Sequence, residues 1–204
     1  NGGGILTMDS CKMNGPITMD GDKLTMTDCS VTYAGNGDSA IQVNSASELN
    51  LTDTSVTYEG AKTTGGAVCI SGAGSIAMEG CTIQNLSSAG IYFRKDLDVI
   101  TIGNCRIEGC QIEAGGQNME AIWIDTLSAG NQITIENSKV SAPNGYAVST
   151  GWKLDKDATI TLGGGNTFDG RIRVTGNTDP AYRYRFLVGR PIQLRQAGCV
   201  CERE

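Results

Sequence analysis

Histidine is absent from the 204-residue chain, which excludes any mechanism that needs an imidazole as acid, base or triad member. Basic residues are few as well: 16 Lys and Arg against 22 Asp and Glu give a net charge of −6, which argues against nucleic acid as a partner. No apolar run is long enough to cross a bilayer, so we expect no membrane insertion. No segment carries the apolar stripe of an amphipathic helix, so helix should be scarce.

Glycine, by contrast, is abundant at 28 residues, while proline is limited to 4 and the aromatic residues to 2 Trp, 6 Tyr and 3 Phe. The remainder is rich in Thr, Ser, Asn, Ile and Val. This composition is typical of many short strands joined by tight turns. The sequence therefore predicts an all-β architecture.

An eight-residue template recurs seven times, with apolar residues at positions one, three and eight and a small residue at position six. The copies are Leu6–Met13, Leu24–Val31, Leu49–Val56, Ile76–Ile83, Ile100–Ile107, Ile133–Val140 and, with one inserted residue, Ile160–Phe168. Positions one and three face the same side of a strand. A second apolar strand follows most copies, at 40–43, 67–70, 90–93, 121–124, 147–150 and 171–174.

Successive copies are spaced from 18 residues, between Met8 and Met26, to 33 residues, between Ile102 and Ile135. This spacing suits coils whose strands stack in register at about 4.8 Å, with loops that absorb the variation. We therefore predict a single-stranded parallel β-helix of about seven coils. A leucine-rich repeat has a different consensus, and a β-sandwich does not require the same template seven times.

The start Asn1-Gly-Gly-Gly-Ile5 followed by Leu-Thr-Met, and the recurring Leu/Ile-x-Met/Ile-x-x-Cys-x-Ile units, resemble the pectin-lyase-like right-handed β-helix superfamily. Within that superfamily they resemble repeat regions of bacterial surface and adhesin-like proteins. The resemblance covers roughly residues 1 to 175 and implies a right-handed helix with a three-sheet cross-section. It also implies an extracellular or cell-surface location. The chain starts without methionine and partway through a repeat, so we expect a mature or trimmed fragment, and a longer chain could carry further domains.

Eight cysteines suggest disulfides or a metal site, but four of them occupy template position six, where other copies have Thr54 or Ser138. A position shared by Cys, Thr and Ser is a small interior site, so we expect free, buried thiols at Cys11, Cys29, Cys81 and Cys105. Cys69 should face outward on its strand, and Cys110 lies in a long loop. Cys199-Val-Cys201 has no second ligand pair, so we predict no metal site and no cofactor.

The outward residues of the second strand should form one row along the rod, consisting of Gln42, Cys69, Tyr92, Trp123, Ser149 and Arg173. Tyr92 and Trp123 would be neighbours, and two aromatic rings side by side form a platform on which a sugar ring can stack. Polar and aromatic residues after these strands, Arg94, Asp96, Asp125 and Trp152, would complete a glycan-binding site. Alternatively, the loop from Glu108 to Glu120 or the C-terminal tail covers the rings.

Catalytic motifs are incomplete. Asn177-Thr-Asp179 and Arg171-Ile-Arg173 resemble parts of a polygalacturonase signature, but they occur in the wrong order and the other two motifs are missing. Asp96, Asp98 and Asp125, beside Arg94 and Lys95, are the only group that could serve a Ca²⁺-dependent lyase, and solvated loop charges explain it more simply. A Thr-bearing ladder is too interrupted for ice binding. We therefore favour binding or display over catalysis, with a polysaccharide lyase or glycoside hydrolase as the alternative.

The repeat stops near residue 176, and the composition changes there. From Arg171 onward 7 Arg face 3 acidic residues, a net charge of +4. Ala181–Val188 alternates aromatic residues with arginine and predicts a strand. Since the end of a solenoid exposes apolar core, we expect β-helix repeats over 1–175 and a capping segment over 176–204. The alternative is a junction to a further domain or subunit.

Overall fold

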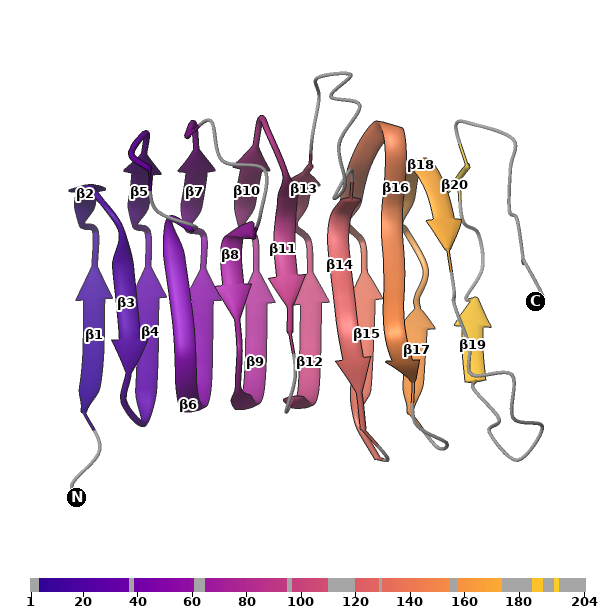
Figure 1. Ribbon diagram of the computed structural model, residues 1–204, viewed down its shortest axis with the longest axis horizontal. Coiled ribbons are helices and arrows are strands. Elements are labelled where there is room, and N and C mark those ends of the chain that lie inside the picture. The colour runs from indigo at the N-terminus through magenta and orange to yellow at the C-terminus, as the bar shows by residue number, and fades with distance from the viewer. Residues whose placement is uncertain are drawn as a thin grey trace.

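The computed structural model describes residues 4–36, 39–60, 65–94, 97–109, 120–128, 130–154, 158–173, 185–188 and 193–194, the backbone alone for 152–154, 185–188 and 193–194. These residues form a rod of stacked coils in which the strands run side by side from the N-terminal to the C-terminal end (Figure 1). Every strand pairing is parallel, as in a helix of β-strands. Within the described residues, no helix is long and apolar enough to span a membrane.

The first of three ladders contains the template copies. Its strands are β1 (Ile5–Asp9), β4 (Lys23–Thr27), the end of β6 (Ile41–Thr52), β9 (Ala73–Glu79), β12 (Leu97–Gly103), β15 (Gln132–Glu136), β17 (Thr159–Leu162) and β19 (Arg185–Val188). The first seven of these strands contain positions one to three of the seven predicted copies, paired position for position. The predicted β-helix of about seven coils is therefore confirmed.

Two further ladders complete each coil and give the cross-section three sides. The second contains β2 (Lys12–Asn14), β5 (Ser30–Tyr33), β7 (Ser55–Tyr58), β10 (Thr82–Asn85), β13 (Arg106–Glu108), the start of β16 (Lys139–Leu154), the start of β18 (Thr167–Arg173) and β20 (Gln193–Leu194). The third contains β3 (Ile17–Asp20), the start of β6, β8 (Gly66–Ile70), β11 (Ala89–Phe93), β14 (Glu120–Leu127) and the ends of β16 and β18. Each of the first seven coils thus contributes one rung to every ladder, and β19 and β20 add an eighth rung to the first and second ladders.

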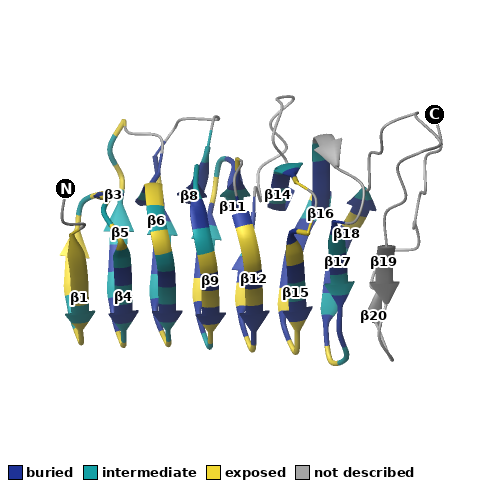
Figure 2. Cartoon of the chain, turned by 90° about the horizontal axis from the view of Figure 1, so that it is seen from below, coloured by how far each residue is buried: buried dark blue, intermediate teal, exposed yellow. Residues whose placement is uncertain are grey.

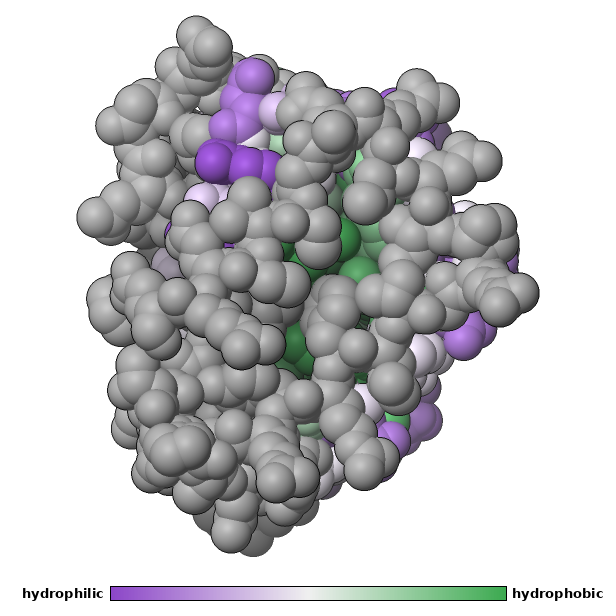
Figure 3. Space-filling model, turned by 90° about the vertical axis from the view of Figure 1, so that its right-hand side faces the viewer, coloured by the Kyte–Doolittle hydropathy of each residue, from purple (hydrophilic) through white to green (hydrophobic). Residues whose placement is uncertain are grey.

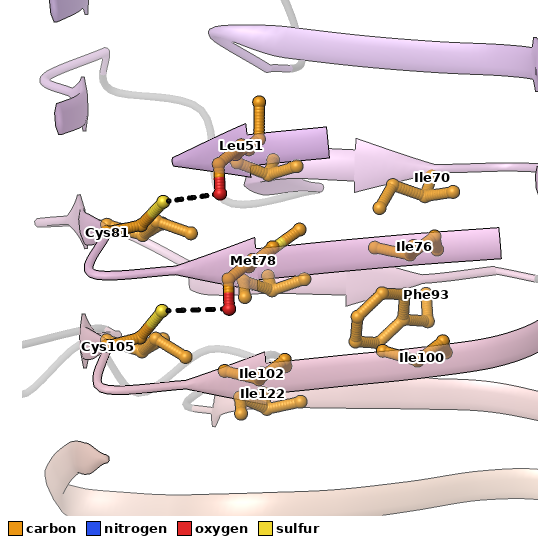
Figure 4. Packing of buried hydrophobic residues seen from close by; sticks show 14 of the residues in the cluster. Leu51, Ile70, Ile76, Met78, Cys81, Phe93, Ile100, Ile102, Cys105 and Ile122 are labelled. Carbon is orange, nitrogen blue, oxygen red and sulfur yellow. Dashed lines mark hydrogen bonds between the residues drawn. The ribbon is translucent and has the colours of Figure 1, made fainter. Parts of the chain in front are cut away.

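The core lies inside the rod, where equivalent apolar residues stack on one another. Ile76 and Ile100 occupy template position one in neighbouring coils, and both are buried (Figure 4). Phe93, from the third ladder, packs into the same interior. Buried and exposed residues alternate along the strands, as Figure 2 shows for β9 and β15. Since each buried Leu, Ile or Phe contributes about 1.5–3 kcal/mol, the stack of coils is what stabilises the fold.

Template position five makes the turn between the first two ladders. The backbone there is left-handed, with φ from 48° to 64°, at Ser10, Asp28, Asp53, Gly80, Asn104 and Asn137. Asp, Asn and Gly tolerate this conformation better than other residues, because a short polar side chain can bond locally or no Cβ is present. A column of Ser, Asp, Gly and Asn at position five is the sequence signal for this turn. The residue inserted in the seventh copy preserves it, since Gly165 has φ 75°.

Position six has the expected free thiols, and its small residues share one hydrogen-bonding role. Cys105 Sγ donates to Gly103 O at 3.1 Å, Thr54 Oγ1 to Thr52 O at 2.9 Å, and Ser138 Oγ to Glu136 O at 2.7 Å. The Sγ atoms of Cys81 and Cys105 also reach a carbonyl of the preceding coil, Leu51 O at 3.3 Å and Met78 O at 3.6 Å (Figure 4). Cys11, Cys29, Cys81 and Cys105 are free thiols. Cys29, Cys81 and Cys105 are buried as predicted, whereas Cys11 is only half-buried, because the first coil is covered on one side only. Cys110, Cys199 and Cys201 lie outside the described residues.

Apolar residues lie at both ends of the rod, and among the described residues those at the N-terminal end are exposed. At the N-terminal end, the side chains of Ile5, Leu6 and Met13 are exposed, with Ile5 at 71%. Seen from the end that carries β19, hydrophobic surface lies in the middle of the molecule (Figure 3). β19 falls within the predicted strand Ala181–Val188 and adds a rung beside β17. The predicted boundary near residue 176 lies outside the described residues, so the capping function stays a prediction.

Candidate functional site

The predicted outward row exists in the third ladder. Gln42 pairs with Cys69, Cys69 with Tyr92, Tyr92 with Trp123, Trp123 with Ser149 and Ser149 with Arg173. Because the pairing is in register, these side chains succeed one another along one face of the rod, at intervals of about 4.8 Å. The face also holds Arg94, directly after β11, and Asp125, near the end of β14. We call this surface the aromatic face.

Tyr92 and Trp123 stack on each other. Their ring centroids are 4.2 Å apart and their planes differ by 9°. This distance is close to the spacing between rungs, so the ring planes lie across the rod and each ring turns one flat face toward the other. The two half-buried rings therefore present their edges outward as an apolar ridge. The pair differs in this respect from the flat platform that the sequence suggested.

The row residues on either side of the stack are covered. Cys69, beside Tyr92, is 2% exposed, and Ser149, beside Trp123, is fully buried. Cys69 thus lies in the outward row as predicted, but its thiol does not reach the surface. The small size of both residues allows the larger neighbours in the row to close over them.

Charged groups flank the stack at its Tyr92 end. The Tyr92 hydroxyl donates to Asp125 Oδ2 at 3.4 Å, and the guanidinium carbon of Arg94 lies 5.7 Å from the centre of the Tyr92 ring. Burial raises the pKa of Tyr92, and the charge of Asp125 raises it further, while Arg94 opposes the shift. Gly151, on the next rung, makes room for Asp125, since a Cβ there would lie 2.7 Å from Asp125 Oδ1.

Four of the six predicted site residues, Tyr92, Trp123, Arg94 and Asp125, therefore lie on one face. Asp96 lies outside the described residues. Trp152 belongs to β16, directly after the row, but its side chain is also outside the description. Residues 110–119 of the loop that was expected as an alternative cover for the rings also lie outside the described residues. The role of these residues in ligand binding stays a prediction.

A second cluster continues the aromatic face toward the C-terminal end. The guanidinium of Arg173 spans two rungs: Nε and Nη2 donate to Ser149 Oγ at 3.0 and 2.8 Å, and Nη2 donates to Glu120 Oε1 at 3.2 Å. The guanidinium carbons of Arg171 and Arg173 lie over the ring of Tyr146, at 4.4 and 4.2 Å from its centre. We call Glu120, Tyr146, Ser149, Arg171 and Arg173 the arginine cluster.

Glu120 is the buried charge of this cluster. Its side chain is 5% exposed, and its Oε2 atom is buried without a hydrogen-bond partner. Burial raises the pKa of Glu120, because removal from water penalises the carboxylate, while the nearby charge of Arg173 acts in the opposite direction. A carboxyl of raised pKa beside a guanidinium and a tyrosine is a combination that can exchange a proton with a ligand.

The sequence did not indicate this cluster, because an irregularity in β16 assembles it. The register between β16 and β18 shifts on both sides of Tyr146 and places Tyr146 opposite Arg171. Arg173 was assigned to the outward row, but nothing in the repeat pattern pairs it with Glu120, 53 residues earlier. Among all the described residues, no group of three or more acidic or cysteine side chains could hold a metal ion.

Comparison with known proteins agrees with the fold. A family model described as "Right handed beta helix region" matches residues 2–178, which is most of the chain. No curated protein and no solved structure matches it significantly. The family match shows that the β-helix is right-handed, and the parallel ladders show that the chain folds as a solenoid. The chain therefore belongs to the right-handed β-helix family.

Proposed function

We propose that this chain is a rigid, glycan-binding segment of a bacterial surface or secreted protein, and that the aromatic face binds the glycan. The observation that carries the proposal is the stacked pair of Tyr92 and Trp123, half-buried on a regular outward row and flanked by a carboxylate and a guanidinium. Stacked aromatic side chains with a few polar groups beside them are typical of sites that bind amphipathic ligands such as sugars.

The geometry suggests how an extended glycan would lie. The ring edges form an apolar ridge against which the C–H groups of a sugar can pack. Asp125 can accept hydrogen bonds from sugar hydroxyls, and Arg94 can donate to ring or hydroxyl oxygens. Because each ring already uses one flat face for its partner, the sugar gains edge contacts and no full stacking surface. We therefore expect weak affinity for one site, in the range of about 0.1–1 mM.

Binding to a panel of neutral and acidic polysaccharides, measured by affinity electrophoresis and calorimetry, tests the proposal. Trp123→Ala should abolish binding, because it removes half of the ridge. Tyr33→Ala is a matched control, since Tyr33 is also half-buried and forms a tilted pair with Tyr58, 5.8 Å away, in the second ladder. No binding across the panel, or equal loss in both folded variants, would refute the assignment of the aromatic face.

An enzyme of the polysaccharide lyase or glycoside hydrolase type is the second candidate. One observation favours it: Glu120, with its raised pKa, lies against Arg173 in the arginine cluster, where it could transfer a proton. Release of unsaturated products or reducing ends from the same panel, with and without Ca²⁺, tests this activity. Product that disappears in Glu120→Gln would establish catalysis, whereas a panel without product would leave binding as the function.

A further inference from the structure

The arginine cluster carries more positive charge than its own carboxylate offsets. Arg171 and Arg173 both lie over the ring of Tyr146, each within 4.4 Å of its centre, so their like charges are held close together. Glu120 is the one acidic residue that pairs with them among the described residues. Within the described residues, one guanidinium charge is thus left without a counter-charge, and such a charge attracts anions.

The unused donors show where an anion would bind. Nε and Nη2 of Arg173 are occupied by Ser149 and Glu120, which leaves Nη1. Arg171 is exposed and makes no hydrogen bond or ion pair in the described part of the chain, so its whole donor fork is available. The donors available to an anion are therefore all the N–H groups of the Arg171 guanidinium and the Nη1 group of Arg173.

We infer that Arg171 and Arg173 form a subsite for a tetrahedral oxyanion, the sulfate or phosphate ester of an anionic glycan that lies along the aromatic face. An ester of this kind has three terminal oxygens. Two can accept the fork of Arg171 while the third reaches Nη1 of Arg173. A planar carboxylate has only two oxygens. The paired N–H donors of one guanidinium already satisfy both, so a carboxylate gains little from the second arginine.

The fixed position of Arg173 supports this site. Its side chain is held by buried Ser149, by buried Glu120 and by the ring of Tyr146, so little conformational entropy is lost when an anion binds. Arg173 is two rungs from Trp123, roughly 10 Å along the rod, so one oligosaccharide could contact both the ridge and the subsite. The inference extends the proposed function and names the class of glycan.

The test compares dextran sulfate, phosphorylated dextran, polygalacturonate and unmodified dextran as ligands of the full chain at physiological salt. Arg171→Gln should weaken binding of the sulfated or phosphorylated polymer by about 10-fold and leave binding of unmodified dextran unchanged. Whichever of the two esters binds more tightly identifies the natural group. The control is Arg106→Gln, which makes the same charge change at an exposed, ion-paired arginine on β13.

Equal loss in Arg171→Gln and Arg106→Gln would overturn the inference, because general electrostatic attraction would then explain the binding. Polygalacturonate that binds as tightly as the esters would also overturn it. The outcome is distinguishable from failure of the proposed function. Ester binding that depends on Arg171 but not on Trp123 would retain the subsite and refute the aromatic ridge.

Discussion

Ser138 offers a sharp test of how the coils hold together, because it occupies template position six and bonds to two coils. Its Oγ donates to Glu136 O at 2.7 Å and accepts the backbone N–H of Cys105, in the preceding coil, at 3.1 Å. Ser138 and Cys105 are both buried. In Ser138→Ala, the N–H of Cys105 loses this partner, whereas Glu136 O still accepts the N–H of Asn104 at 3.2 Å.

The expected destabilisation follows from this difference. A buried N–H without a partner costs about 1–3 kcal/mol, and the carbonyl that keeps a partner adds little. We therefore expect Ser138→Ala to lower the free energy of unfolding by about 2 kcal/mol, a fall of roughly 4–8 °C in Tm for a domain of this size. Ser138→Cys should lose about half as much, because the thiol sulfur is a weak acceptor that can replace part of the hydrogen bond from the N–H of Cys105.

Thermal and urea unfolding, followed by circular dichroism, measure both variants against the native chain. Position six would not be a hydrogen-bonding site if Ser138→Ala changed the unfolding free energy by less than about 0.5 kcal/mol. The same conclusion would follow if Ser138→Cys were as destabilising as Ser138→Ala. A repeat protein can unfold in stages, so the thermal and urea unfolding curves of each variant should be compared with those of the native chain over their whole range.

Further changes test the turn, the core, the buried charge and the end of the rod. Asn137→Val should lose about 1–2 kcal/mol in urea unfolding, because φ 48° strains a β-branched residue, whereas Asn137→Gly should be close to neutral. Phe93→Ala should lose about 3–5 kcal/mol by the same measurement, since the ring is fully buried. Because the pKa of Glu120 is raised in the folded state, its contribution to stability is present below pH 4 and is lost as the pH rises through the raised value. Glu120→Gln should thus gain Tm relative to the native chain between about pH 4 and 7, and a constant difference would contradict the shift. Deletion of residues 177–204 should cause aggregation in light scattering if they cap the rod, and a monomeric, equally stable product would exclude that role.

The recurring pattern of apolar and small residues was sufficient to predict the fold. Positions one and three of the template bury residues such as Leu24 and Met26, and the in-register pairing follows from the recurrence of the same pattern. The shared role of Cys105, Thr54 and Ser138 could also be inferred, since one position tolerated all three. Regularity is the reason: each coil repeats the same environment, so one copy informs the others.

The parts that the sequence could not supply depend on irregular local geometry. Stacking of Tyr92 on Trp123 follows from register, but the orientation of the rings depends on how each side chain turns over its small neighbours. The arginine cluster depends on the shift around Tyr146, which breaks the alternation from which outward positions were assigned. The left-handed turn at position five did have a signal, the column that includes Asp28 and Asn137, which apolar periodicity does not detect.

The most direct test of glycan binding is a titration of isotopically labelled protein with the tightest-binding polysaccharide fragment, followed by NMR chemical-shift mapping. The account predicts shifts concentrated on β11, β14 and the end of β18, including the indole N–H of Trp123 and the guanidinium N–H groups of Arg171. Shifts confined to another ladder, such as β4, β9 and β12, or no shifts at saturating ligand, would contradict it.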